Sequence, residues 1–206
     1  MTASPPPLPR RGLLLGLAAA ALAGCAHRSA PARRLYGLTG LPPLPADARP
    51  GRDNRAWVLG PQVALPELLD RDEILVASGS AGLAPLPEAR WAEPLRDALP
   101  RLLAEDLARL RQPYPVALGK PQAPAGESLR LLVRVDEWLA RPDAAGLRLA
   151  LRARWHWLPL QAPVDTPLPA PGSADLALPC AAQADALAEA YRRSVTALAA
   201  AIVAGS

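Results

Sequence analysis

Cysteine, histidine, paired acids and arginine carry the chemistry available to this sequence, and Cys25 has the most informative setting. Arg10 and Arg11 precede an apolar run over 12–23 that contains no charged residue. At about 1.5 Å per residue a helix over this run spans roughly 18 Å, too short for a hydrocarbon core of about 30 Å. The pattern is typical of a secretory signal peptide, and we expect residues 1–24 to be removed.

The residues around Cys25 indicate lipid attachment. Leu22, Ala23 and Gly24 stand directly before it and resemble the lipobox of bacterial lipoproteins. Small side chains at Ala23 and Gly24 let a peptidase close on the backbone, and the Cys25 thiol is the nucleophile that can carry a diacylglycerol. Because each buried methylene contributes about 0.8 kcal/mol, two or three acyl chains hold a domain on a bilayer. By resemblance to Gram-negative lipoproteins, the non-acidic Ala26 favours the outer membrane over the inner one.

The alternative for Cys25 is an ordinary signal peptide followed by a cysteine without a role. If Cys25 is acylated, Cys180 has no partner for an intramolecular disulfide. We expect Cys180, beside Pro179, to be a small packed side chain rather than a metal ligand or a bridge between two chains.

Enzyme motifs are missing from the sequence. It contains no HExxH, P-loop, GxSxG or CxxC pattern, and the adjacent acids Asp72-Glu73 and Glu105-Asp106 have diverging side chains. We therefore expect no catalysis, no cofactor and no metal. Removing Arg10 and Arg11 with the signal peptide leaves 21 basic and 19 acidic residues, a net charge of +2. A surface so close to neutral gives no electrostatic reason for nucleic-acid binding.

Two long strands are predicted over 129–138 and 147–157, joined by a hairpin connection. Apolar residues alternate with arginines along both, so an antiparallel pair in even register places the arginines on one sheet face. These candidate partner-facing residues are Arg130, Arg134, Arg148, Arg152 and Arg154. They could bind lipid phosphates or an acidic partner, or they could form an ordinary solvated face. Because like charges repel, we expect the face to contact another chain, either a second copy or a different protein.

The pattern over 92–110 predicts a helix with a kink at Pro100, and a second helix is predicted over 183–204. Asp106 projects into the apolar arc of the first helix. It is either an acid with a raised pKa or, as we expect, a carboxylate that accepts hydrogen bonds from the amides of a neighbouring loop.

The chain is long enough for one domain with a sizeable core. Short strands are predicted near 57–59, 63–65, 73–77 and 83–86, with one helical turn over 67–70. Residues 25–53 are rich in Pro, Arg and Ala and are predicted to be a tether, and the Pro-rich stretch 159–180 is predicted to be loop. The fold class that follows is α/β: a single domain over 54–206, with a central mixed sheet packed by two principal helices.

Several segments resemble one known family, the ABC-type transport auxiliary lipoproteins, which include the paraquat-inducible PqiC-like proteins. They are Trp57-Val58-Leu59-Gly60-Pro61, then 63–71 leading into 74–76, then 90–95 with 97–99, and finally 103–107. The resemblance covers about 57–157 and extends to the terminal Ala-rich helix. It implies a three-layer arrangement of the sheet and helices. Pro100 and the Pro-rich stretch 159–180 depart from the family pattern.

The resemblance also implies a function. Such lipoproteins are outer-membrane, non-catalytic parts of MCE-type systems, in which an MCE protein bridges the periplasm from an inner-membrane ABC transporter and lipids move between the two membranes. This chain would be the docking component, on the periplasmic face of the outer membrane, and could form a homo-oligomer. The alternative is a structural or assembly lipoprotein of another envelope complex, such as a secretion or pilus accessory.

Overall fold

The computed structural model describes residues 33–46, 48, 51–121, 127–144, 146–160 and 165–206, all within one compact unit, Arg33–Ser206. In chain order the strands are β1 (Arg34–Tyr36), β2 (Ala56–Leu59), β3 (Glu73–Ser78), β4 (Gly82–Trp91), β5 (Val116–Leu118), β6 (Ser128–Asp143), β7 (Gly146–Pro159) and β8 (Gly172–Cys180). The helices are the 3-10 turn η1 (Glu67–Leu69), α2 (Leu95–Leu110) and α3 (Ala184–Ala204).

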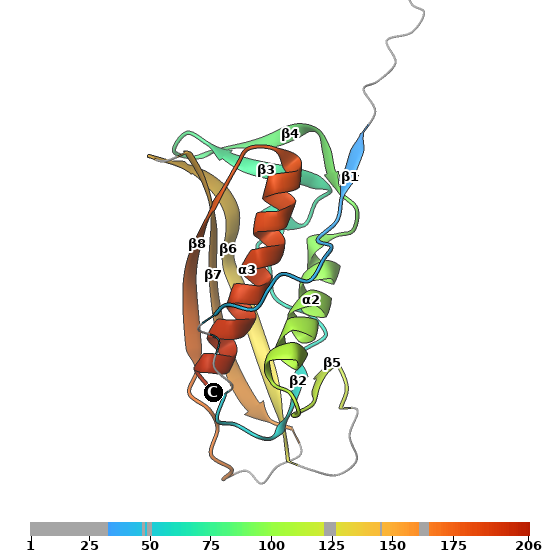
Figure 1. Cartoon of the computed structure of the whole chain (residues 1–206), viewed down its shortest axis with the longest axis vertical. Coiled ribbons are helices and arrows are strands. Elements are labelled where there is room, and N and C mark those ends of the chain that lie inside the picture. The colour runs from blue at the N-terminus through green and yellow to red at the C-terminus, as the bar shows by residue number, and fades with distance from the viewer. Residues whose placement is uncertain (1–32, 47, 49–50, 122–126, 145, 161–164) are drawn as a thin grey trace, which may run out of the picture. The chain divides into compact units, whose positions relative to one another are not determined.

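All eight strands form one mixed sheet, and β6 is its central member (Figure 1). On one side β7 runs antiparallel to β6 along its length, and β8 pairs with β7. The other edge of β6 pairs with two strands. β2 pairs in parallel with residues 128–131 of β6, and β3 pairs in parallel with β6 at Ala140. β5 lies beyond β2, and the β3–β4 hairpin, with β1 at its edge, completes the other branch.

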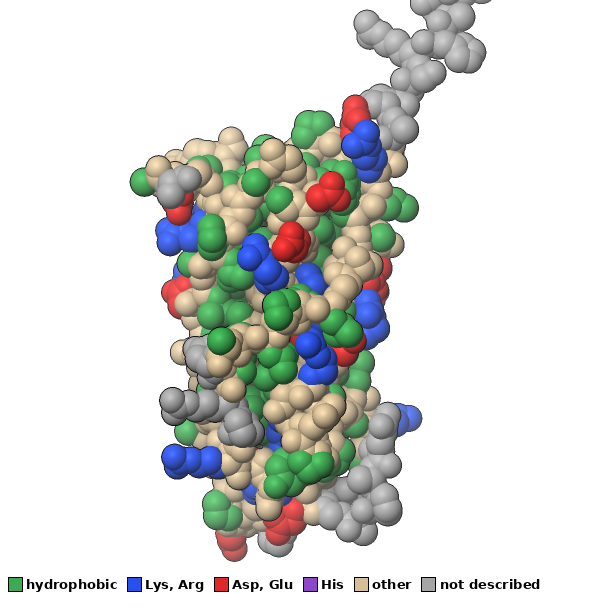
Figure 2. Space-filling view, in the orientation of Figure 1, with side chains coloured by type: hydrophobic (Ala, Val, Ile, Leu, Met, Phe, Trp, Pro, Cys, Tyr) green, Lys and Arg blue, Asp and Glu red, His purple; other side chains and the backbone are tan. Residues whose placement is uncertain are grey.

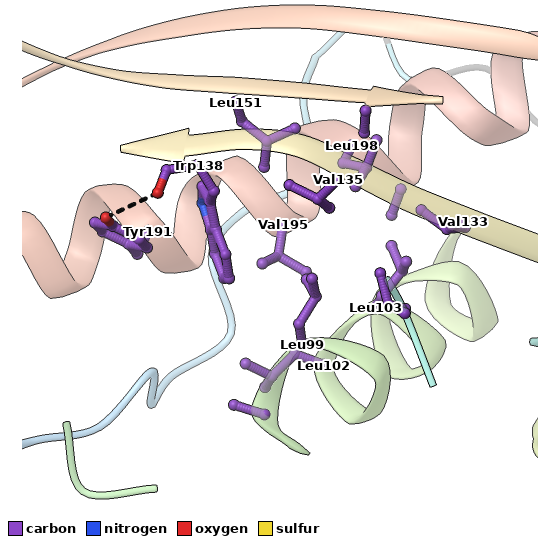
Figure 3. Close-up of a cluster of buried hydrophobic side chains, with 14 of the residues drawn as sticks. Leu99, Leu102, Leu103, Val133, Val135, Trp138, Leu151, Tyr191, Val195 and Leu198 are labelled. Atoms are coloured by element: carbon purple, nitrogen blue, oxygen red, sulfur yellow. Dashed lines mark hydrogen bonds between the residues drawn. The ribbon is translucent and has the colours of Figure 1, made fainter. Parts of the chain in front are cut away.

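Both helices lie on the same face of this sheet (Figure 1). Leu99, Leu102 and Leu103 of α2 contribute to the core with Val195 and Leu198 of α3, and they pack toward β6 in the cluster drawn in Figure 3. The other face of β6 and β7 carries charged side chains instead. The α/β class with a mixed sheet and two principal helices is confirmed, but the layers number two rather than three. The alternation in β6 and β7 explains this, because only one face of each strand is apolar.

The described parts of 37–55, here called the strap, cross the outer side of the helices (Figure 1). Within the range predicted to be tether, residues 34–36 form β1, and Leu38 is buried in the core. Nη2 of Arg111 donates to the carbonyl oxygens of Asp53 and Arg55 at 2.7 and 2.9 Å. The folded domain therefore begins near 34 and not near 54. The sequence analysis missed this boundary because a strand of three residues is too short to give a recognisable pattern.

Two other expectations change. The Pro-rich stretch 159–180 was expected to be loop, but residues 172–180 form β8, in register with β7 from Trp155↔Gly172 to Leu147↔Cys180. Gly172 is required there, since a Cβ at this position would lie 2.4 Å from the ring of Trp155. The first long helix, predicted over 92–110, runs from Leu95 to Leu110, and Pro100 lies buried inside it.

A buried ion pair joins the two helices. Asp106 of α2 and Arg192 of α3 are 0% and 1% exposed, and their side chains form hydrogen bonds of 2.5 and 3.0 Å. Thr196 donates to the same carboxylate at 2.8 Å, and Arg109 donates at 3.0 Å. Burial alone would raise the pKa of Asp106, but the hydrogen bonds from Arg192 and Thr196 hold it below its ordinary value of 3.8.

The expected partners of Asp106, amides of a neighbouring loop, are thus wrong: the carboxylate is satisfied by side chains of the helices themselves. The loop is present but takes a different part, because Nε of Arg192 donates to the carbonyl oxygen of Gly40 at 3.1 Å and Arg109 donates to that of Pro42 at 3.1 Å. The pair therefore ties the strap to both helices.

Asp106→Asn should lower the free energy of unfolding by about 3–5 kcal/mol, because removal of one partner leaves Arg192 as a buried charge without its counterion. Equilibrium unfolding in urea measures the change. The matched control is Glu105→Gln on the exposed side of the same helix, which should stay within about 0.5 kcal/mol of the parent. Equal stability of the two variants would contradict the importance of the pair.

Candidate partner-binding surface

The predicted lipid-attachment residue Cys25 and its preceding residues Leu22, Ala23 and Gly24 lie outside the described residues. Lipid attachment therefore stays a prediction from the sequence. The candidate surface within the described domain is the sheet face opposite the helices.

The structure places all five predicted arginines on this helix-free face. In the β6–β7 ladder Arg134 stands directly opposite Arg154, and Arg130 stands opposite Leu158. Residues directly opposite each other in an antiparallel pair project to the same face. Arg148 and Arg152 follow at alternate positions of β7, and their side chains are 50% and 56% exposed. The alternation along each strand was sufficient to predict this arrangement.

A bulge in β6 adds acids to the same face. The register shifts between Val135 and Glu137, so that Asp136 is the extra residue and Glu137 pairs with Arg152. Because of the shift, both consecutive acids contact arginines of the helix-free face. In a strand with regular alternation, one of the two would point into the core. Sequence reasoning missed these acids, although Asp136-Glu137 inside an otherwise alternating strand is the signal that could have revealed them.

The acids divide the arginines into local ion pairs. Asp136 accepts hydrogen bonds from Arg134 at 3.1 Å and from Arg154 at 2.8 and 3.0 Å. Glu137 accepts from Arg152 at 2.7 Å and also pairs with Arg141, an arginine that the sequence analysis did not single out.

Further acids flank β7. Arg148 lies 3.3 Å from Asp143, and Arg152 lies 3.8 Å from Asp175 of β8. We call this whole set the charged face: Arg130, Arg134, Asp136, Glu137, Arg141, Asp143, Arg148, Arg152, Arg154 and Asp175. Its six arginines exceed its four acids by two charges. The repulsion that led us to expect a partner is therefore largely compensated within the chain, and the excess is modest.

Arg130 differs from the other arginines of the charged face. It is half-buried, and its Nε is shielded from solvent and has no hydrogen-bond partner among the described residues. It pairs with Val58 on β2 and with Leu158 on β7. Arg130 therefore lies beside apolar side chains at the β2 end of the charged face, whereas the ion pairs occupy the rest.

The helical side of the domain has a different character. Acidic and basic side chains are interspersed there, with apolar ones between them (Figure 2). A hollow of about 520 Å³ lies between the strap and α3, bordered by Asp185, Glu189 and Arg193. Among the described residues no three histidine, cysteine or acidic side chains lie close enough to bind a metal ion, and no helix is long and apolar enough to cross a membrane.

A family model for the ABC-type transport auxiliary lipoprotein component matches residues 36–203, most of the described domain. The chain belongs to this family. The match begins within β1 and ends in α3, so it includes the strap, β8 and the charged face. No curated protein matches the chain.

Two solved structures share the fold. A Xanthomonas campestris protein of family DUF330 superposes with a TM-score of 0.64 at 17% identity, over 82% of this chain and 92% of that one. An uncharacterized protein superposes with a TM-score of 0.55, also at 17% identity, over 84% and 97% of the two chains. These likenesses show the fold, and the family match over 36–203 spans nearly all of the unit Arg33–Ser206.

The ion pairs of the charged face predict one measurable pKa. The guanidinium groups of Arg154 and Arg134, which hydrogen-bond to Asp136, hold the pKa of that carboxyl below its ordinary value of 3.8. Arg154→Gln should raise the pKa of Asp136 toward this value, as followed by carboxyl-detected NMR titration. Arg130→Gln, on the same face but without a contact to Asp136, should leave it unchanged. An identical pKa in both variants would mean that the Arg154–Asp136 pair does not persist in solution.

Proposed function

We propose that this chain is the outer-membrane docking component of an MCE-type ABC system that moves lipids between the inner and outer membranes and so supports membrane integrity. Membership of the transport auxiliary family over 36–203 is the observation that carries the proposal. The protein acts without catalysis. Its partners are an MCE-type protein that spans the periplasm and, through it, the inner-membrane transporter.

The anchor in this proposal is an acylated Cys25. The apolar run over 12–23 and the lipobox-like Leu22, Ala23 and Gly24 support it, and the family is one of lipoproteins. Ala26 supports delivery to the outer membrane. The acyl chains hold the domain on the periplasmic face, so the tether need only cover 26–33 because the strap belongs to the fold.

The docking surface in this proposal is the charged face. No helix among the described residues covers it, and it belongs to the most extensive strand pairing of the sheet. Exposed ion pairs contribute little to the stability of a domain, so their side chains can exchange partners with acids of another chain at low cost. The excess of two positive charges favours an acidic surface on the MCE-type protein.

Cys25→Ser should abolish acylation and leave the protein soluble or unprocessed in the periplasm, because serine lacks the thiol that receives the diacylglycerol. Fractionation of envelopes after a high-salt wash, with mass spectrometry of the N-terminal peptide, measures the result. Cys180→Ser is the matched control and should fractionate as the parent does. If the Cys25→Ser protein remained in the outer-membrane fraction after the wash, acylation of Cys25 could not be the anchor.

Arg148→Glu combined with Arg152→Glu should weaken binding to the MCE-type partner and leave the fold of the monomer intact, because both side chains are half exposed. A pull-down from detergent-solubilised envelopes with mass spectrometry identifies the partner, and titration at two salt concentrations measures the affinity. Binding by the parent should weaken as salt rises, since exposed charges are screened over about 8 Å at physiological ionic strength.

The control for this pair is Arg96→Glu with Arg101→Glu on α2. These side chains are 59% and 53% exposed, and each forms one ion pair, so the control makes the same change of charge at matched exposure on the helical side. Equal loss of affinity in both double variants would reduce the effect to net charge. Unchanged affinity in the Arg148 and Arg152 variant would leave the charged face as ordinary solvated surface.

A further inference from the structure

The strand β4 crosses one end of the domain and exposes an unusual run of apolar side chains. In Figure 1 the long strands β6–β8 run along the molecule, and the β3–β4 hairpin lies across their end, next to β1. Leu83 is 44% exposed, and Ala84, Pro85 and Pro87 are also exposed. Leu35 of the neighbouring strand β1 is 68% exposed. We call these five residues the β4 ridge.

Cross-strand register extends the ridge into an apolar surface. Leu83 pairs with Ala77, and Pro85 pairs with Leu75. Leu75 and Ala77 form a small buried cluster with Leu139 of β6, separate from the main core. Leu83 and Pro85 therefore project from the same side as this cluster and continue it toward solvent.

The ridge is poorly suited to pairing with another strand. Pro85 and Pro87 lack a backbone N–H and therefore cannot donate to a further ladder. In addition, Glu88 has a φ of 59°, in the left-handed region, so the backbone turns away from regular extension just before β4 meets β1. An occupant of the ridge must therefore bind side chains rather than main chain.

The chain itself indicates which occupant this is. β1 pairs with β4 at Leu35↔Arg90, so the segment that leads back to Cys25 leaves the domain beside the ridge. Arg34 lies nine positions after Cys25, and an extended chain spans at most about 3.6 Å per position, so the two lie within roughly 32 Å of each other. Arg33 and Arg34 are exposed at this point, where anionic headgroups would attract them.

We propose that the β4 ridge rests in the interfacial layer of the phospholipid bilayer that holds the acylated Cys25. This inference rests on the lipid anchor of the proposed function. The short tether confines the domain near the surface, so even a small apolar contact suffices to orient it. β6–β8 then extend away from the membrane, and the end of the domain with β2 and β5 is directed into the periplasm.

The test places an environment-sensitive fluorophore on the acylated full chain. In a Cys180→Ser background, Leu83→Cys is labelled and the protein is reconstituted on vesicles of phosphatidylethanolamine and phosphatidylglycerol. Leu168→Cys is the matched control, because Leu168 is 41% exposed and follows the strand β7 at the opposite end. The label at 83 should gain at least about twofold in intensity on vesicles and be quenched by lipids brominated in their acyl chains. The label at 168 should do neither.

The outcomes separate the two proposals. If the protein floats with the vesicles but the label at 83 stays in water, the orientation is wrong and the anchor stands. A protein that does not float with the vesicles refutes the anchor and the orientation with it. An intensity gain at 83 that appears without vesicles, on raising the protein concentration, would assign the ridge to a contact between copies and overturn the proposal. Leu35→Cys, on the other strand of the ridge, should repeat the result at 83.

Discussion

The buried ion pair between Asp106 and Arg192 connects parts of the domain that are far apart in the sequence. It joins the two helices through residues that are 86 positions apart in sequence, and the same guanidinium reaches the strap at Gly40. A charge this deeply buried is tolerated only when its hydrogen-bonding groups are satisfied, and here Thr196 and Arg109 complete the carboxylate side. The orientation of α2 against α3, and the path of the strap over both, follow from that requirement.

With both helices committed to one face of the sheet, the other face is free to be charged. The bulge at Asp136 makes that face a set of ion pairs rather than a cluster of arginines. In a cluster the like charges would repel one another, whereas the ion pairs compensate most of that repulsion within the chain and can rearrange when another charged surface approaches. The charged face is therefore compatible with a domain that is folded both alone and within a larger assembly.

The elements visible in the sequence are those with a repeated local pattern. β6 and β7 alternate for many residues, and α2 and α3 repeat leucine or a similar side chain every three or four residues, so both types could be predicted. β1 and β5 have three residues each, and β8 contains Pro179 in a Pro-rich stretch, so no local pattern marks them as strands. Their structure depends on partners far away in sequence. The same holds for Asp106, whose burial was evident but whose partner Arg192 was not.

The strap has a mechanical consequence. A pull on the N-terminal end of the domain is felt first by β1, whose three residues form a short ladder with β4 that gives little resistance. The load then reaches Gly40 and Pro42, whose carbonyl oxygens accept hydrogen bonds from Arg192 and Arg109. Since both arginines bind Asp106, the load is passed to the junction of the two helices before it reaches the strands of the charged face. The buried ion pair thus becomes the point at which a pull on the N-terminal end is shared between the strap and both helices.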